Sequence, residues 1–242
     1  MAHTAVIAGV GPGLGASLAR RFAAEGCDVG LLARTESFVQ GLAADIRTEY
    51  PGDAVAASAD ITDREAVADA FATVREAFGP VDVLVNHASG ATWDGADVDP
   101  ADFRHSLEVG PVGSLHCTQE ALADMRDTEE DGPPEGTRGT VIFTGATSAV
   151  RGREGALGFS AAKFAVRGMA ESLARELGPE GVHVAHVVID GGIATPAALE
   201  AGADPDELLD PDAIADSYWH LVEQDRSSWT LELDLRPHVE EF

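Results

Sequence analysis

A glycine-rich segment near the start of the chain carries the residue types that bind a phosphate group. Gly9–Gly15 (GVGPGLG) follows a short apolar run and precedes a helical pattern. In a strand–turn–helix context, glycines allow a tight turn and let the backbone approach a pyrophosphate, whose charge is met by N–H groups at the helix start. The glycines fit two spacings, Gly11-x-Gly13-x-x-Ala16 and the wider Gly9-x-x-x-Gly13-x-Gly15. The segment predicts a dinucleotide site, and a glycine-rich turn that binds no ligand is the alternative.

The second apolar run ends at a residue that bears on the choice of nucleotide. It reads Leu32-Ala33-Arg34-Thr35, with no acid at its end. A carboxylate there would accept hydrogen bonds from a ribose 2′-OH and repel a 2′-phosphate, whereas the guanidinium of Arg34 matches phosphate geometry. We therefore expect NADP(H) rather than NAD(H), and the alternative is that Arg34 is a solvated residue at a helix start.

The histidines and cysteines predict neither a metal site nor a disulfide framework. His183 and His186 are three apart in a strand pattern, so we expect their side chains on opposite faces of the sheet. The other histidines are scattered singly. Cys27 and Cys117 lie far apart in the chain, and we expect both to be buried thiols.

Short runs rich in Val, Ile and Leu alternate with longer stretches of helical period. This alternation predicts an α/β fold of the Rossmann type, a doubly wound seven-stranded parallel sheet in a single domain over residues 1–242. Strands are expected near Thr4–Ala8, Val29–Ala33, Ala54–Ser58, Val81–Asn86, Thr140–Thr144, His183–Ile189 and Leu231–Leu235. Helices are expected near Leu14–Glu25, Ser37–Tyr50, Asp63–Phe78, Phe103–Arg126, Leu157–Leu177 and Asp212–Gln224.

Two irregular stretches fall between these elements. Asp127–Gly139 combines proline, glycine and acidic residues, which is typical of a surface loop. Gly191–Pro211 follows the sixth strand, where a doubly wound sheet places the segment that covers its substrate. We expect residues 191–211 to form a lid.

The charge of the chain narrows the classes of partner. The chain has 42 acidic and 16 basic residues and a net charge of −26, so we expect it to repel nucleic acid. The acid is spread through the chain, as in a halophilic protein, and suits a high-salt cytoplasm. No charged and apolar leader precedes the first strand, and no apolar run is long enough to cross a bilayer. We expect a cytoplasmic protein that does not enter a membrane.

Several motifs in chain order resemble those of the short-chain dehydrogenase/reductase (SDR) family. Gly9–Gly15 in its wider spacing resembles the family's glycine motif, and Asp60-Ile61 resembles its adenine-contacting pair. Asn86–Ser89 (NHAS) resembles its Asn-Asn-Ala-Gly turn, Phe159–Lys163 (FSAAK) its Tyr-x-x-x-Lys motif, and Asp190–Pro196 (DGGIATP) its Pro-Gly segment ahead of the lid. The resemblance implies a small-molecule substrate, a homodimer or homotetramer, and NADP bound by Gly9, Gly13, Leu14, Gly15, Arg34, Asp60, Ile61, Asn86, Ala88, Lys163, Ile193 and Thr195.

The chain departs from that family at the residues that move a proton. Phe159 stands at the place of the family's tyrosine, Ala146 at the place of its serine, and Gly110 at the place of its helix asparagine. Lys163, the only lysine in the chain, remains. In the family this lysine binds the nicotinamide ribose, so its retention favours cofactor binding, with a surface position on a helix as the alternative.

Other groups near this point are the candidates for a replacement proton donor. The nearby hydroxyls are those of Thr144, Thr147, Ser148 and Ser160. Ser148 is the best candidate among them, so the predicted catalytic positions are Lys163, Phe159 and Ser148. Asp190 either lies near the nicotinamide or caps backbone N–H groups. Two hypotheses remain, an NADP(H)-dependent oxidoreductase with a nonstandard proton donor and a non-catalytic NADP(H)-binding sensor or scaffold.

Overall fold

Seven parallel strands form one sheet in the order β3-β2-β1-β4-β5-β6-β7 in the computed structural model, which describes residues 3–127 and 136–240. The strands are β1 (Thr4–Ala8), β2 (Asp28–Ala33), β3 (Ala54–Ser58), β4 (Val83–Asn86), β5 (Gly139–Thr144), β6 (Val182–Ile189) and β7 (Glu232–Leu235). The helices are α1 (Leu14–Ala24), α2 (Glu36–Glu49), α3 (Arg64–Phe78), α4 (Pro100–Leu107), α5 (Gly113–Asp127), α6 (Leu157–Leu177), α7 (Pro196–Glu200) and α8 (Pro211–Val222). The predicted doubly wound sheet is confirmed, and its strands lie within two residues of the predicted bounds.

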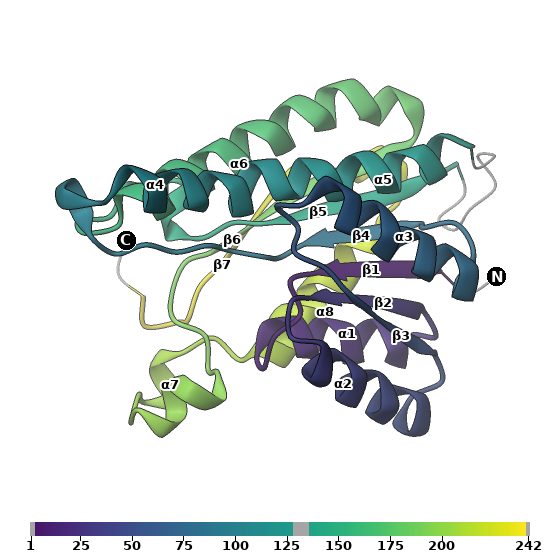
Figure 1. Cartoon of the computed structure of the whole chain (residues 1–242), viewed down its shortest axis with the longest axis horizontal. Coiled ribbons are helices and arrows are strands. Elements are labelled where there is room, and N and C mark those ends of the chain that lie inside the picture. Colours follow the sequence, from purple (N-terminus) through teal and green to yellow (C-terminus); the bar gives the residue numbers. More distant parts are fainter. Residues whose placement is uncertain (1–2, 128–135, 241–242) are drawn as a thin grey trace.

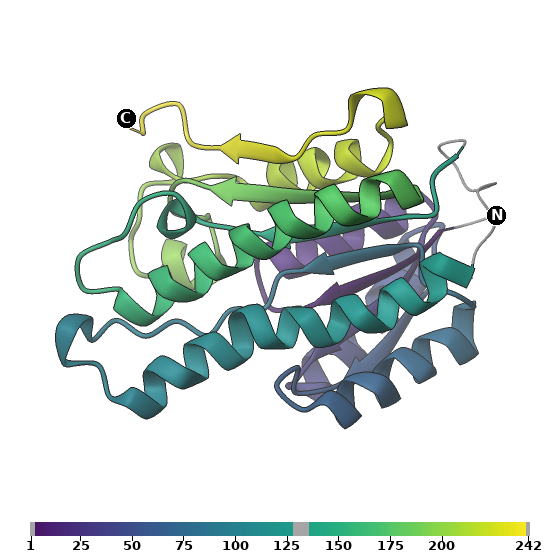
Figure 2. The same ribbon diagram turned by 90° about the horizontal axis from the view of Figure 1, so that it is seen from above.

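Helices cover both faces of the sheet because successive strand residues alternate between two cores. Ile7 on β1 packs among residues of α1, α2 and α8, whereas its neighbour Val6 packs among residues of α3, α5 and α6. Figure 1 shows α3, α5 and α6 above the sheet and α1, α2 and α8 below it. Seen from above, α4, α5 and α6 run across the sheet (Figure 2). The residues at the strand ends are therefore held between two packed layers.

The helix predicted over Phe103–Arg126 is wrong as a single element. A π-helical turn at Glu108–Val112 separates α4 from α5. Pro111 lies within this turn and has no backbone N–H to donate to the preceding turn, which accounts for the change in hydrogen bonding. Gly110 lies in the same turn, where an added Cβ would be 3.0 Å from the Cβ of Ala162 on α6. The break therefore lies where two helices approach closely beside the predicted site.

Segment 191–211 contains structure that the sequence analysis did not predict. It holds the short helix α7, and Ile193 and Leu209 form a β-bridge near its two ends. Figure 1 shows α7 projecting below the carboxyl ends of the strands. The predicted loop Asp127–Gly139 lies largely outside the described residues.

Several predictions about single residues can be compared with the described part of the chain. Cys27 and Cys117 are free and buried, as expected. Nδ1 of His183 donates to the carbonyl oxygen of Leu221 in α8, whereas His186 contacts Glu232, which pairs with Arg167 of α6. The two histidines therefore face opposite sides of the sheet. Among the described residues, no helix is long and apolar enough to span a membrane.

Candidate active site

A cleft opens where the strand order reverses, at the carboxyl ends of β1 and β4. A doubly wound sheet leaves a crevice there because the helices that follow these two strands cross to opposite faces. The cleft has a volume of about 370 Å³. Five of the residues predicted to bind the cofactor line it: Gly9, Arg34, Asp60, Ile61 and Ala88. The structure thus brings together residues from turns that are distant in the sequence.

The glycine turn packs so closely on the turn after β4 that side chains cannot fit. Gly9 has φ +108°, and a Cβ on it would lie 2.4 Å from the backbone nitrogen of Ala88. A Cβ on Gly15 would lie 2.9 Å from the carbonyl oxygen of Gly9. Gly13 stands at the N-cap of α1 and has no side chain to satisfy the N–H groups of the first turn. The N–H of Ala16 donates to the carbonyl oxygens of Gly11 and Gly13, so the N–H groups of Leu14 and Gly15 are the ones available to an anion.

The far end of the cleft carries one exposed cation and one fixed carboxylate. Arg34 is exposed at the end of β2. Asp60 accepts from the backbone N–H of Thr62 at 3.0 Å and from its hydroxyl at 2.8 Å. The backbone hydrogen bond and, to a smaller extent, the hydroxyl and Arg34 lower the pKa of Asp60 below its ordinary value. Asp60 is therefore ionised and oriented at neutral pH.

Four of the residues predicted to bind the cofactor line neither this cleft nor the cavity described next, namely Gly13, Leu14, Gly15 and Asn86. Leu14 is buried in the core at the start of α1. Asn86 is also buried, and its side-chain nitrogen donates to the Thr118 hydroxyl on α5 at 3.1 Å. This hydrogen bond joins the end of β4 to α5, so the side chain of Asn86 points away from the cleft.

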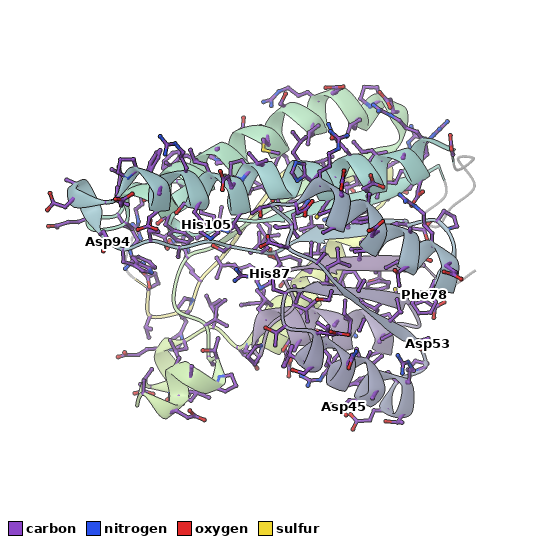
Figure 3. The ribbon with its side chains drawn as sticks, viewed as in Figure 1. Asp45, Asp53, Phe78, His87, Asp94 and His105 are labelled. Atoms are coloured by element: carbon purple, nitrogen blue, oxygen red, sulfur yellow. The ribbon has the colours of Figure 1, made fainter. Side chains whose placement is uncertain are left out.

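A second cavity, of about 320 Å³, adjoins the cleft, and we call it the substrate cavity. His87 and Ser89 belong to the walls of both. Figure 3 labels His87 at the end of β4 and His105, another residue of the cleft wall, on α4. The predicted residues Lys163, Phe159, Ser148, Ile193 and Thr195 line the substrate cavity.

Lys163 lies in the wall of the substrate cavity and is 7% exposed. Its ammonium donates to the carbonyl oxygen of Thr144 at the end of β5, at 2.8 Å. Burial lowers the pKa of Lys163 to about 8. The alternative of a surface lysine is therefore wrong, because the side chain points inward from α6 to the end of the sheet.

The groups that surround Lys163 are poor proton donors. The ring of Phe159 covers the lysine, with its centroid 5.7 Å from Nζ. Ala146 offers only a methyl group. Ser148 is fully buried in a short 3-10 turn, and its hydroxyl has no hydrogen-bond partner among the described residues. That hydroxyl is enclosed by protein and does not reach the open part of the cavity.

Sequence reasoning missed a buried chain of hydrogen bonds that ends in the substrate cavity. The hydroxyl of Tyr218 on α8 lies 2.8 Å from the hydroxyl of Thr144, which lies 3.2 Å from Nδ1 of His87. Burial and, secondarily, the ammonium of Lys163 lower the pKa of His87 to about 4, so its ring is neutral at pH 7. The one available signal was His87 itself, a titratable residue in a turn where the resembled family has asparagine.

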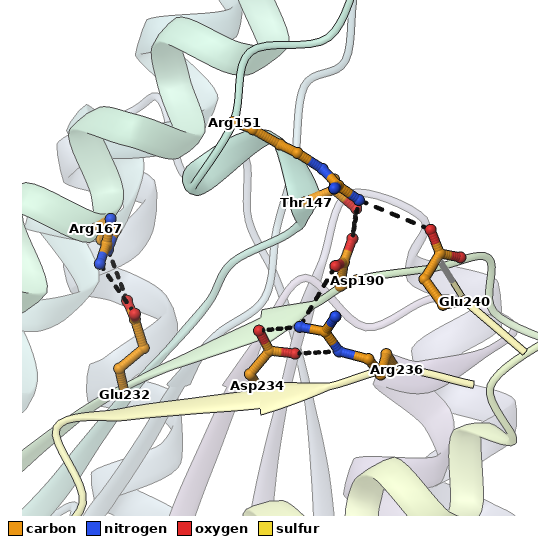
Figure 4. A network of polar contacts seen from close by, with 8 residues as sticks. All are labelled: Thr147, Arg151, Arg167, Asp190, Glu232, Asp234, Arg236 and Glu240. Atoms are coloured by element: carbon orange, nitrogen blue, oxygen red, sulfur yellow. Dashed lines mark hydrogen bonds and ion pairs between the residues drawn. The ribbon is translucent and has the colours of Figure 1, made fainter. Parts of the chain in front are cut away.

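Among the described residues, Asp190 caps no backbone N–H group, which was one of the two roles expected for it, and its place near the nicotinamide stays a prediction. Its carboxylate accepts from the Thr147 hydroxyl at 2.6 Å and pairs with Arg151 at 3.3 Å and Arg236 at 3.6 Å (Figure 4). Its hydrogen-bond donors are therefore side chains rather than backbone N–H groups. Because two arginines hold it, Asp190 joins the turn after β5 to the segment after β7.

Segment 191–211 contacts the glycine turn through one threonine. The methyl group of Thr195 lies 3.0 Å from the place of a Cβ on Gly13. The hydroxyl of Thr195 accepts from the backbone N–H of Ala198 at 3.2 Å and so caps α7. Thr195 therefore connects the start of α7 to the start of α1.

No three His, Cys, Asp or Glu side chains converge as a metal site within residues 3–127 and 136–240.

Comparison with known proteins agrees with this geometry. Residues 3–206 match the short chain dehydrogenase family. The short-chain reductase protein NovJ of Streptomyces niveus is 33% identical over 239 residues, which cover 96% of this chain and 87% of that protein. An alcohol dehydrogenase from the archaeon Thermococcus sibiricus, complexed with 5-hydroxy-NADP, has the same fold, with a TM-score of 0.87 at 22% identity over 100% of this chain and 99% of that chain.

A relative with a different nucleotide is also similar. The 3-ketoacyl-(acyl-carrier-protein) reductase of Brucella melitensis, complexed with NADH, is 28% identical with a TM-score of 0.83, covering 98% of this chain and 97% of that chain. The chain therefore belongs to the short-chain dehydrogenase/reductase family of NAD(P)-binding oxidoreductases.

Proposed function

We propose that the protein is an NADP(H)-dependent oxidoreductase that interconverts a small carbonyl compound and its alcohol without a tyrosine as proton donor. The observation that carries this proposal is the position of Lys163. Its buried ammonium lies in the substrate cavity, which shares His87 and Ser89 with the cleft at the switch point of the sheet. A nucleotide in the cleft would therefore place its reactive end beside a cation and an open cavity.

The glycine turn and Lys163 support the binding of a dinucleotide. Gly9 and Gly15 leave no room for side chains of their own, and the unsatisfied N–H groups of α1 suit a pyrophosphate. Lys163 is the donor that would hold the hydroxyls of the inner ribose. When bound, NADPH would supply the hydride for reduction of a carbonyl.

The preference for NADP(H) over NAD(H) is part of the proposal. The two solved relatives described above hold different nucleotides, so they do not decide the question. Arg34 does favour one of them, because its exposed guanidinium lies in the wall of the cleft and pairs with no described carboxylate. A 2′-phosphate would supply an anion within hydrogen-bond distance of this guanidinium.

His87 is the group that we assign to the substrate oxygen. Tyr218 has one O–H, and Thr144 is its one described partner, so we infer that Tyr218 donates to Thr144 and that Thr144 donates to Nδ1 of His87. The ring proton then lies on Nε2, the edge of the ring left free of described hydrogen bonds. A neutral N–H of this kind can stabilise developing negative charge on a carbonyl oxygen, and water would supply the proton.

Segment 191–211 is proposed to act as a lid over the substrate. Ile193 and Thr195 line the substrate cavity, and Thr195 also contacts the glycine turn. A substrate would therefore lie between this segment and the end of the sheet.

Calorimetric titration of the purified protein with NADPH and NADH, in multimolar salt because of its acidic composition, tests the proposal. We expect saturable binding of NADPH that is tighter than that of NADH. If neither coenzyme binds, the proposal is wrong. If both bind equally, only the assignment of Arg34 is wrong.

A non-catalytic NADP(H)-binding sensor or scaffold is the second candidate. One observation favours it: Phe159 covers Lys163 with an apolar ring, and Ala146 leaves no hydroxyl beside it. This candidate predicts NADPH binding without carbonyl reduction for any substrate. The double variant described in the Discussion separates the two functions.

We also propose that the protein forms a homodimer or homotetramer through α5 and α6. Large apolar side chains are exposed there, namely Leu115 on α5 and Leu157 and Phe164 on α6. Light scattering after gel filtration would measure the mass, and Phe164→Asp is expected to lower it. A monomeric wild-type protein would contradict this assignment. The cytoplasmic location and the adaptation to high salt stay predictions.

A further inference from the structure

The substrate cavity has a charge opposite to that of the protein as a whole. The chain carries a net charge of −26, yet no Asp or Glu is among the described residues that line this cavity. Its charged residues are Lys163 and Arg153. A concave site with low-dielectric walls and one sign of charge attracts ligands of the opposite sign. The cavity therefore favours an anion, although the surface around it repels one.

Arg153 is available to bind that anion. Its backbone N–H donates to the hydroxyl of Ser160 at 3.2 Å, which attaches it to the start of α6. Its guanidinium lies over the ring of Trp93, 5.8 Å from the ring centroid, and no described carboxylate is within ion-pair distance. In contrast, Arg75 binds two carboxylates. A guanidinium without an ion-pair partner can bind a ligand carboxylate or phosphate by donating two parallel hydrogen bonds.

Two aromatic rings lie between Arg153 and Lys163. The centroids of Trp93 and Phe159 are 5.4 Å apart, and Trp93 is 57% exposed. Arg153 lies over Trp93 at the outer end of this pair, and Lys163 lies beside Phe159 at the inner end. The wall therefore presents a cation, two apolar ring surfaces and a second cation in that order.

From this order of contacts we propose that the substrate cavity binds an aryl carbonyl compound that carries an anionic group at the end of its ring opposite the carbonyl. The anion pairs with Arg153, the aryl ring packs on Trp93 and Phe159, and the carbonyl lies at the inner end beside Lys163 and His87. This inference rests on the proposed function for the inner end only. Recognition of the anion and the ring does not require that the protein be catalytic.

The test uses a pair of small probes that differ in charge. The protein, loaded with NADP⁺ so that no reduction occurs, is titrated calorimetrically with 4-acetylbenzoate and with its neutral methyl ester at one fixed ionic strength. We expect 4-acetylbenzoate to bind at least about 10-fold more tightly, because a charge-assisted hydrogen bond to an arginine is lost in the ester. Titration with 4-acetylphenyl phosphate shows whether the natural anion is a phosphate rather than a carboxylate.

Two arginine variants assign the effect to its source. Arg153→Gln is expected to reduce the preference for 4-acetylbenzoate over the ester to within about twofold. Arg20→Gln removes the same charge from α1, far from the cavity in the sequence and with no described ion pair, and is expected to keep the preference. Trp93→Ala is expected to weaken both probes alike, because it removes ring contact and not charge.

The outcomes separate this inference from the proposed function. If the protein binds no NADP(H), the same titrations on the unloaded protein still test the anion site. Equal affinity for 4-acetylbenzoate and its ester, a preference that survives Arg153→Gln, or no saturable binding of either probe to either form would overturn the inference. Binding of 4-acetylbenzoate without any reduction by NADPH would support the inference while favouring the non-catalytic function.

Discussion

The cleft and the substrate cavity share His87 and Ser89, yet they differ in how far their other residues match the motifs of the family. The cleft has Gly9, Asp60 and Ala88 at places that match the family's motifs, although His87 stands where the family has asparagine. The substrate cavity contains Lys163, but Phe159 and Ala146 stand where the sequence resemblance predicts a tyrosine and a serine. Gly110, which does not line this cavity, stands where it predicts the helix asparagine. Under the proposed function, the proton chemistry of the site has changed and the nucleotide site has not.

Phe159, Ala146 and Gly110 differ in how closely neighbouring residues pack against them. Phe159 and Ala146 each lack one oxygen relative to tyrosine and serine, and both line the cavity. Gly110 is different, because an added Cβ would lie 3.0 Å from the Cβ of Ala162. A larger residue there would push the π-helical turn away from α6. Phe159 and Ala146 are therefore the positions to substitute in a test, whereas the packing against α6 restricts substitution of Gly110.

The largest expected effect comes from restoring the two lost hydroxyls. Phe159→Tyr with Ala146→Ser places a phenol and a hydroxyl beside the ammonium of Lys163. If the cavity is otherwise intact, reduction of carbonyl probes by NADPH is expected to rise by about 10²- to 10⁴-fold, the usual contribution of a positioned acid. The measurement is the initial rate of NADPH oxidation with 4-acetylbenzoate and a panel of neutral ketones.

The control for this double variant is its affinity for NADPH, which should equal that of the wild type. A double variant that binds NADPH normally and shows no gain with any carbonyl would count against a catalytic cavity. It would leave the non-catalytic sensor or scaffold as the better function.

The next largest effect is expected at Lys163, which lines the substrate cavity and is proposed to bind the nucleotide. Lys163→Met removes a buried charged donor, so affinity for NADPH is expected to fall by about 10- to 100-fold. In the wild type, affinity should also fall as the pH rises through about 8, because the ammonium then loses its proton. The variant should show no such dependence on pH. Calorimetry between pH 6.5 and 9.5 measures both effects.

Thermal unfolding of Lys163→Met distinguishes lost binding from lost structure. The pKa of this lysine is lower in the folded chain than in the unfolded chain, so its charge costs folding free energy below pH 8, and the cost declines as the pH rises. The variant is therefore expected to melt at a higher temperature than the wild type at pH 7. Weaker binding in a variant that melts lower would point to a packing role instead.

The sequence was sufficient to predict the fold because its apolar runs and glycines act locally. The burial of β1 on both faces, the tight turn at Gly9 and the helical stripe of α1 each follow from neighbouring residues. The break at Pro111 was missed because the flanking residues keep a helical period. Helix α7 was missed because it is short and its cap, Thr195, looks like any loop threonine.

The site was harder to predict, since side chains from distant segments meet there. The contact between Tyr218 and Thr144 joins residues 74 apart. Trp93 and Arg153 are brought to Phe159 by two loops that carry no periodic pattern. No rule of spacing links such residues, so the hydrogen-bond chain and the aromatic wall appear only in three dimensions.

A smaller effect is expected at the outer end of the cleft. Arg34→Gln removes the cation proposed to bind the 2′-phosphate, so affinity for NADPH is expected to fall by about 10-fold. Affinity for NADH should be unchanged, because NADH carries no phosphate there. Arg20→Gln serves as the matched control for net charge. An equal loss of affinity for both coenzymes would mean that Arg34 contacts a part of the nucleotide other than the 2′-phosphate.

The smallest effect is expected behind the substrate cavity, at Tyr218. Tyr218→Phe removes one buried hydroxyl that donates to Thr144, so the free energy of unfolding should fall by about 1 kcal/mol. Tyr50→Phe is the control, since the hydroxyl of Tyr50 has no described partner. Without the hydroxyl of Tyr218, Thr144 can also accept a hydrogen bond from Nδ1–H of His87. ¹⁵N NMR should therefore show the Nδ1–H tautomer gaining at the expense of Nε2–H. An unchanged tautomer in Tyr218→Phe would mean that Tyr218 on α8 does not determine which ring nitrogen of His87 carries the proton.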